Sequence, residues 1–172
     1  MIHEIRLLGD PILREKTREV ETFDEELAAF VADLVETMYA AEGVGLAAPQ
    51  VGDPRCVTVI DVGVARDGSE VIALVNPRIV SAEGTIQSEE GCLSIPGAVE
   101  TIERAARVEV EYSDPTGQVH RITGEELLGR ALQHEIDHLD GILFIDHLGP
   151  LKRRIVVRDW KRAMSDEGIE VP

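Results

Sequence analysis

The spacing of apolar residues along the chain predicts two long helices. After Asp24, which is placed to cap a helix, apolar residues recur at intervals of three and four. This pattern predicts a helix over 25–42 that ends at Gly43, since glycine is common just past a helix C-terminus. A second helix is predicted over 125–140, ending at Gly141. Its apolar face consists of Leu127, Leu128, Ala131, Leu132 and Leu139.

A third helix is predicted near the C-terminus. Pro150 suits its first turn, because a helix N-terminus leaves N–H groups unpaired and proline has none. Leu151, Ile155 and Val156 are expected to form its apolar side. The stretch 151–162 also holds six of the 17 basic residues: Lys152, Arg153, Arg154, Arg158, Lys161 and Arg162. These side chains form either a solvated helix face or a contact with an anionic assembly such as the ribosome.

The middle of the chain has the pattern of β-strands. Two β-branched segments, 56–62 and 71–77, are predicted to pair across a turn at Asp67-Gly68. Segment 106–113 alternates apolar and polar residues and is predicted to pair with 118–123. The predicted class is therefore α+β. Mixed or antiparallel sheets surround one central helix, and an N-terminal and a C-terminal helix accompany it.

The length and the net charge of the chain limit the classes of protein to which it can belong. We expect one domain over 1–172, with no membrane span and no disulfide framework from Cys56 and Cys92. A formal net charge of -16 argues against a protein that binds DNA through overall charge. With no signal-peptide pattern at the N-terminus, a cytoplasmic location is expected.

The candidate chemistry lies in HEIDH, residues 134–138. Histidines at i and i+4 project from one helix face, so His134 and His138 can reach one ion. Glu135 lies beside that face, where a general base could serve a bound water. The alternative is an ordinary helix that carries two histidines.

A catalytic metal site also needs a third ligand. A metallopeptidase pattern that continues H-x-x-G-x-x-H fails, because Phe144 occupies the last histidine position. Cys92, in the turn-rich segment 89–97, is a better candidate, since a thiolate is a strong ligand for Zn²⁺ or Fe²⁺. The alternative is a small buried cysteine.

A third segment, EGVGLAAPQ (42–50), is rich in small residues. Gly43 and Gly45 flank Val44, and the segment ends in Gln50. It is either a helix terminus packed closely on a sheet, or a backbone that a ligand can lie against, followed by a neutral amide donor.

Together GVGLAAPQ, EGCLS and QHEIDH resemble the three motifs of the peptide deformylases, in order and at the spacing of the compact bacterial form. The similarity extends from 9–14 to 149–154. It implies that Cys92, His134 and His138 bind one divalent ion with water in the fourth position. The ion would be Fe²⁺, with Zn²⁺, Ni²⁺ or Co²⁺ as substitutes.

The resemblance also implies a reaction, the removal of the N-formyl group from the formylmethionine of newly made proteins, with release of formate. Bound water would attack the formyl carbonyl, and Glu135 would accept and later deliver the proton. The Gln50 side chain and the Leu93 backbone N–H would stabilise the oxyanion.

The same resemblance implies where the substrate lies. The peptide would add as a strand along Gly43, Val44, Gly45 and Gly91, and its methionine would enter a pocket walled by Leu127 and Ala131. Arg104 is expected to pair with Glu90.

Two alternatives to the hydrolase remain. A non-catalytic, zinc-stabilised binding module would use the same ligands without Glu135 or Gln50. A Cys92 nucleophile with His134 as its base would leave His138 and Glu135 without a role.

Overall fold

The computed structural model describes residues 1–172 and contains two antiparallel sheets. The larger sheet has the order β1-β2-β3-β6-β7, from β1 (Gly45–Ala47), β2 (Val57–Ile60), β3 (Ile72–Glu83), β6 (Arg107–Ser113) and β7 (Val119–Glu125). The smaller sheet is a hairpin of β4 (Ile86–Cys92) and β5 (Ile95–Arg104). The three α-helices are α1 (Glu25–Ala40), α2 (Glu126–Leu139) and α3 (Pro150–Asp166). Three short 3-10 helices, η1 (Pro11–Arg14), η2 (Ala48–Val51) and η3 (Phe144–His147), complete the fold.

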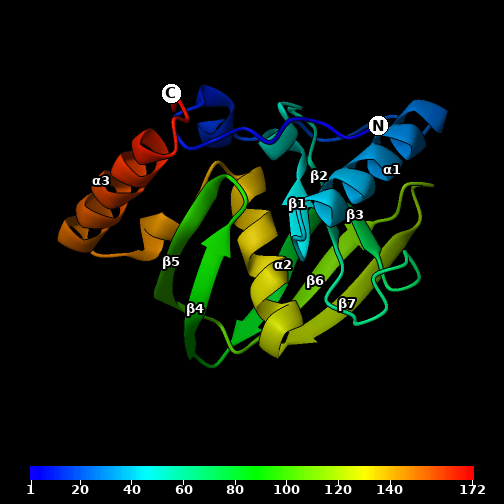
Figure 1. The fold of residues 1–172 in the computed structure, drawn as a ribbon. Helices are drawn as coiled ribbons and strands as arrows, with labels where there is room; N and C mark the ends of the chain where they lie inside the picture. The colour runs from blue at the N-terminus through cyan, green and yellow to red at the C-terminus, as the bar shows by residue number, and fades with distance from the viewer.

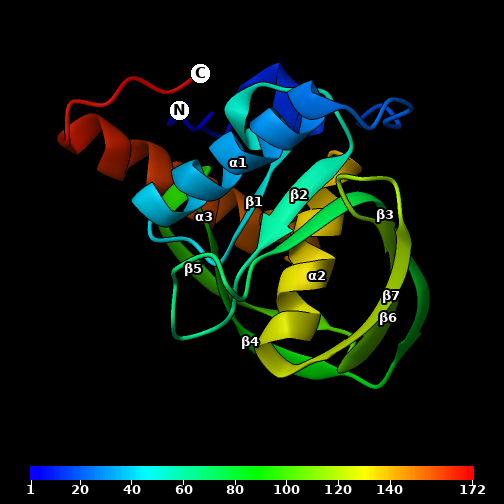
Figure 2. The same ribbon diagram turned by 90° about the vertical axis from the view of Figure 1, so that its right-hand side faces the viewer.

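Helix α2 lies at the centre of this arrangement, between the larger sheet and the β4–β5 hairpin (Figures 1 and 2). Its Ala131, Leu132 and Ile136 pack against buried residues of the larger sheet, among them Leu74 and Val110. This confirms the predicted α+β class with sheets around one central helix. None of the helices combines the length and apolar character needed to span a bilayer.

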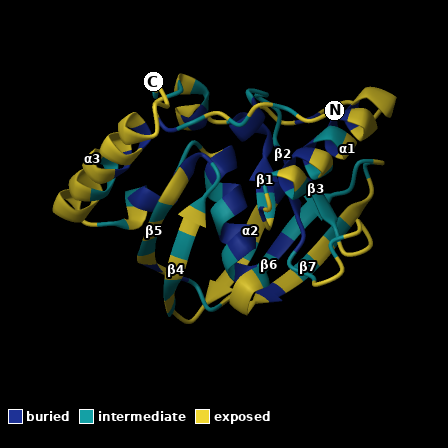
Figure 3. Cartoon of the chain, viewed as in Figure 1, coloured by how far each residue is buried: buried dark blue, intermediate teal, exposed yellow.

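The two outer helices cover opposite ends of the molecule, each through one buried face (Figure 3). Leu27, Phe30, Leu34 and Met38 of α1 pack with residues of β1 and β2. At the other end, Trp160 and Met164 of α3 pack on the hairpin and η3. Of the predicted apolar side, Val156 packs against this cluster, whereas the predictions for Leu151 and Ile155 were wrong, because these residues are 69% and 39% exposed.

Helix α1 begins as predicted and ends differently. The Asp24 carboxylate accepts the N–H of Leu27 and caps the N-terminus. At the C-terminus, Glu42 rather than Gly43 takes the left-handed conformation, with φ of 57°. The N–H of Gly43 donates to the Met38 carbonyl and that of Glu42 to the Tyr39 carbonyl. This is a Schellman motif, with Glu42 in the position that glycine usually takes.

The strand predictions were right for β6 and β7 and incomplete elsewhere. The loop between β2 and β3 spans 61–71 and is much longer than a tight turn. β3 continues to Glu83, six residues past the predicted end at Pro77. The hairpin over 86–104 was not predicted, because its charged residues and glycines hide the alternating pattern.

Candidate functional site

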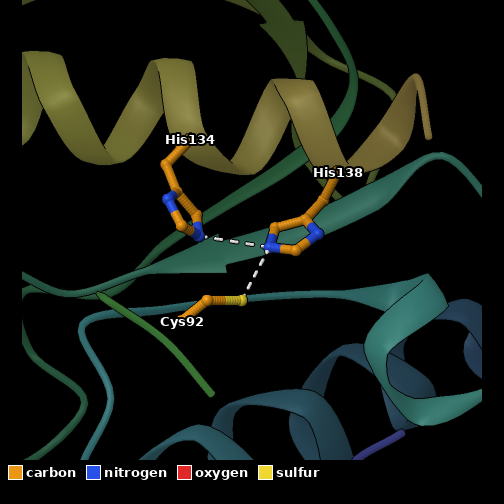
Figure 4. Close-up of side chains that lie close together, drawn as sticks. All are labelled: Cys92, His134 and His138. Atoms are coloured by element: carbon orange, nitrogen blue, oxygen red, sulfur yellow. Dashed lines mark hydrogen bonds between the residues drawn. The ribbon is translucent and has the colours of Figure 1, made fainter. Parts of the chain in front are cut away.

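Two histidines and one cysteine face each other between α2 and the end of β4 (Figure 4). His134 and His138 lie one turn apart on α2, and Cys92 is the last residue of β4. Nε2 of His138 lies 3.1 Å from Nε2 of His134 and 3.3 Å from Sγ of Cys92. All three ligand atoms lie within 4.8 Å of one another. The structure therefore brings the three predicted ligands together.

This donor set fits a divalent metal ion. One sulfur and two imidazole nitrogens suit Zn²⁺ or Fe²⁺. Bonds of about 2.0–2.3 Å in a tetrahedral site place neighbouring donors roughly 3.3–3.6 Å apart. The separations of 3.1 and 3.3 Å are close to that range. The third pair, His134 and Cys92, lies within 4.8 Å, so these two side chains would have to move closer together to bind one ion with His138.

Glu135 lies next to the ligands and is almost fully buried, with 4% of its surface exposed. Its Oε1 has no hydrogen-bond partner within the protein. Burial raises the pKa of this carboxyl to about 7. A Cβ at position 45 would lie 2.6 Å from its Oε2, so glycine at this position makes room for the carboxylate. Glu135 is thus a carboxyl that can change its protonation state near neutral pH.

Gln50 presents its amide NH₂ to the site. Its Oε1 accepts the backbone N–H of Ala47 at 3.0 Å, which fixes the orientation of the amide. Its Nε2 donates to Oγ of Ser94 at 3.1 Å and lies 3.6 Å from Sγ of Cys92. The N–H of Leu93, in the turn after Cys92, has no acceptor in the protein. The Leu93 N–H is therefore unpaired beside the ligand cluster, and the Gln50 amide directs its two hydrogens to Ser94 and Cys92 at the same place.

Buried ion pairs among Glu90, Arg104 and Asp137 connect α2 to the β4–β5 hairpin. Glu90 on β4 accepts from Nδ1 of His134 at 2.8 Å and from Nε of Arg104 at 2.8 Å. Arg104 on β5 also donates to Asp137 on α2 at 2.6 Å. Burial alone would raise the pKa of Glu90, but its bonds with Arg104 and His134 lower it to about 2. The expected pairing of Arg104 with Glu90 is present, and Glu90 stays ionised.

The site opens into a cleft of about 420 Å³. Of the predicted site residues, only His138 does not line this cleft, because it is buried behind the other two ligands. The apolar wall includes Val44, Leu127 and Val99, which are 40%, 42% and 56% exposed. An apolar side chain can therefore be buried beside the metal-ligand cluster.

One edge of the cleft is the free edge of the larger sheet. β1 is the terminal strand, and its register pairs Gly45 with Ile60. The N–H of Asp61 donates to the Val44 carbonyl, so the next residue, Gly45, directs its own N–H and C=O away from β2. Gly45 therefore offers both of its backbone groups to an added strand, whereas the carbonyl of Val44 is already bonded to Asp61 and only its N–H has no acceptor.

Comparison with known proteins places the chain in a family. Residues 2–154 match the family model described as polypeptide deformylase. The chain belongs to that family. A peptide deformylase from Acidobacterium capsulatum is 48% identical over 158 residues, which cover 92% of this chain and 93% of that protein. The deformylases are metal-dependent hydrolases, and the Cys92, His134 and His138 cluster agrees with a metal requirement.

Solved deformylase structures share the fold. A peptide deformylase from Legionella pneumophila superimposes with a TM-score of 0.93 at 46% identity, covering 99% of both chains. The enzyme from Thermus thermophilus gives a TM-score of 0.86 at 43% identity, covering 95% of each chain. A Synechococcus elongatus deformylase in complex with actinonin gives a TM-score of 0.86 at 38% identity, covering 98% of this chain and 89% of that one.

Sequence reasoning overlooked several residues that the fold brings to this deformylase site. Ser94 follows the predicted oxyanion donor Leu93, and its hydroxyl accepts from Gln50, a contact that no spacing rule indicates. Asp137 lies within HEIDH itself, one residue before His138, and could have been noted as a polar residue on a buried helix. Val99 lines the cleft because the unpredicted hairpin carries it there.

Proposed function

We propose that this chain, as one catalytic domain over 1–172, removes the N-formyl group from the formylmethionyl ends of newly made polypeptides. The products are formate and a free amino terminus. One observation carries the proposal: a Cys, His, His cluster, a buried carboxyl and two N–H donors converge on the same cleft. These are the groups that metal-assisted hydrolysis of a linear amide requires.

Cys92, His134 and His138 would hold the divalent ion, which we propose is Fe²⁺, with Zn²⁺, Ni²⁺ or Co²⁺ able to replace it. When bound, the ion supplies a Lewis acid that lowers the pKa of a water molecule. Glu90 supports this site from outside, because its bond to Nδ1 of His134 leaves Nε2 free to face the other ligands.

Glu135 is the proposed general base and acid. Its Oε1 is buried beside the ligands and has no partner in the protein, so it is free to accept a proton from the attacking water. With a pKa raised by burial, the same carboxyl can deliver that proton to the leaving amine. The carboxyl is thereby regenerated after each turnover.

Gln50 and Leu93 are the proposed donors to the developing oxyanion. The formyl oxygen gains negative charge as water adds, and a donor fixed beforehand stabilises that charge without reorganising. The bond from Ala47 to Oε1 of Gln50 fixes its NH₂ in this way. Because the Gln50 amide is neutral, it donates without altering the charge of the ligand set.

The substrate is proposed to add as a strand at the free edge of β1, bonded to Gly45, with Gly43, Val44 and Gly91 alongside. Its methionine side chain would occupy the apolar part of the cleft, against Leu127 and Ala131. Flexible, unbranched methionine suits such a pocket.

The variant Glu135→Gln tests this function. The glutamine side chain has nearly the same shape as glutamate, but its amide cannot accept the proton. Formate release from formyl-Met-Ala should therefore fall at least a hundredfold while the bound metal stays stoichiometric. Glu126→Gln, an exposed glutamate on the same helix, is the matched control and should keep full activity. Formate release by Glu135→Gln at the wild-type rate would refute the proposal and favour a binding module.

We further propose that the exposed side of α3 meets the ribosome in the cytoplasm. Lys152 and Arg153 are used in ion pairs with Glu100 and Asp146, whereas Arg154, Lys161 and Arg162 have no carboxylate partner. Replacing these last three by glutamine should abolish co-sedimentation with ribosomes at low salt and leave formate release unchanged. Unchanged co-sedimentation would refute the contact.

A further inference from the structure

The loop over 61–71 reaches the wall of the cleft through one side chain, Arg66. One guanidinium nitrogen of Arg66 donates to the carbonyl of Gly43 at 2.5 Å. The other donates to the carbonyl of Asp61 at 3.0 Å. Gly43 belongs to the cleft wall and Asp61 follows the end of β2. Arg66 therefore joins these two backbone segments next to the backbone bond from the N–H of Asp61 to the carbonyl of Val44.

These two carbonyls lie where the β1–β2 ladder ends. In an antiparallel ladder, Val44 and Asp61 would exchange two bonds. The N–H of Asp61 does donate to Val44, but Val44 returns no N–H to the carbonyl of Asp61. Arg66 supplies the missing donor to that carbonyl. The last residues before the free edge at Gly45 are thus held by one backbone bond of the sheet and by the Arg66 side chain.

Arg66 is itself held firmly in place. Its guanidinium carbon lies 5.0 Å from the centre of the Tyr39 ring. The Tyr39 hydroxyl donates to the buried carboxylate of Asp61 at 2.5 Å and accepts the N–H of Gly68 at 3.1 Å. Arg66 has a φ of 53°, a left-handed conformation that is strained for a residue with a Cβ. Its two charge-assisted bonds offset that strain.

We propose that Arg66 is a positioning residue for the peptide strand, acting through the carbonyls of Gly43 and Asp61 to order the edge at Gly45. The inference rests on the proposed function, because it assumes that the substrate adds at this edge. Arg66 has no hydrogen bond to the metal ligands, Glu135 or Gln50. Its loss should therefore weaken peptide binding to a similar extent in the ground state and in the transition state, raising KM and leaving kcat nearly unchanged.

The test measures formate release from formyl-Met-Ala-Ser by the metal-loaded wild type and by Arg66→Ala and Arg66→Lys. We expect Arg66→Ala to raise KM about tenfold with kcat within twofold of wild type. Lysine has one point charge and cannot bond both carbonyls in the same way, so Arg66→Lys should raise KM about threefold. Arg78→Ala, an exposed arginine on β3, is the matched control and should keep both constants.

Unchanged KM in Arg66→Ala would overturn the proposal, as would a fall in kcat at constant KM. If Arg66→Ala does not fold, Arg66→Lys decides by the same criteria, since it keeps the charge and most of the stem. Wild type that released no formate would refute the proposed function, and this inference with it. A normal wild-type rate with unchanged KM in the variants refutes only the role of Arg66.

Discussion

Replacing Arg104 by methionine would remove the cation that joins β4, β5 and α2. The Arg104 side chain is 3% exposed, and its two partners, Glu90 and Asp137, are 9% and 21% exposed. Methionine fills a similar volume but leaves Glu90 ionised and buried without its arginine. The expected result is a large loss of stability that does not depend on any metal ion.

The lowered pKa of Glu90, to which Arg104 and His134 both contribute, gives the order of magnitude of this loss. A carboxyl whose pKa falls from 4.5 when unfolded to about 2 when folded stabilises the native state by about 3 kcal/mol at neutral pH. Removing one partner of a buried ion pair typically costs about 3–5 kcal/mol, which agrees with that figure. Since the folded-state pKa is lowered, the stabilisation is present above pH 4.5 and is lost as the pH falls toward 2.

Urea unfolding of the metal-free proteins, followed by circular dichroism, measures this difference directly. Arg104→Met should be about 3 kcal/mol less stable than wild type at pH 7, and the gap should narrow between pH 4.5 and 2. Arg78→Met removes an exposed, solvent-screened pair with Glu111 and should leave the stability nearly unchanged. A difference in unfolding free energy below about 1 kcal/mol at pH 7 would show that the ion pairs of Arg104 do not stabilise the fold.

Three further substitutions test the site itself. Gln50→Ala removes one oxyanion donor, so kcat should fall about 10²–10³-fold with little change in KM, measured by formate release. Gly45→Ala places a Cβ 2.6 Å from Oε2 of Glu135, so activity should fall sharply although the ion stays bound; wild-type activity would contradict the close approach. Asp137→Asn removes a charge that holds Arg104, and release of the ion to a chelator should become about tenfold faster or more.

The helices could be predicted because their signals are local. Asp24 caps α1, Pro150 opens α3, and the leucine spacing of α2 gives both its ends to within a residue. The end of α1 could not be predicted correctly from local signals alone. Gly43 is the residue expected to end α1, yet Glu42 takes the left-handed conformation, and the N–H groups of Glu42 and Gly43 make the bonds of the Schellman motif.

The candidate metal-binding cluster was predictable for a different reason. The spacing of His134 and His138 is set by the helix alone, and Cys92 lies in a distinctive segment. The groups that orient them were harder to find. Ser94 and Asp137 act through contacts between elements that are far apart in sequence. Neither the periodicity of apolar residues nor the spacing of motif residues therefore indicates them. Likewise the inner face of α3 is set by Trp160 and Met164, and of the predicted Leu151, Ile155 and Val156 only Val156 packs with them.

The geometry of the site depends on how the β4–β5 hairpin is fixed against α2, because the candidate metal ligands come from both. The charged end of the hairpin is tied to α2 by Arg104. Its other end, with Cys92 and the fully buried Ile95, packs into the cluster that contains Trp160 of α3. Helix α3 supplies no ligand, but its inner face helps to place Cys92. Substitutions that loosen Trp160 should therefore weaken metal binding, whereas changes on the outer basic face of α3 should not.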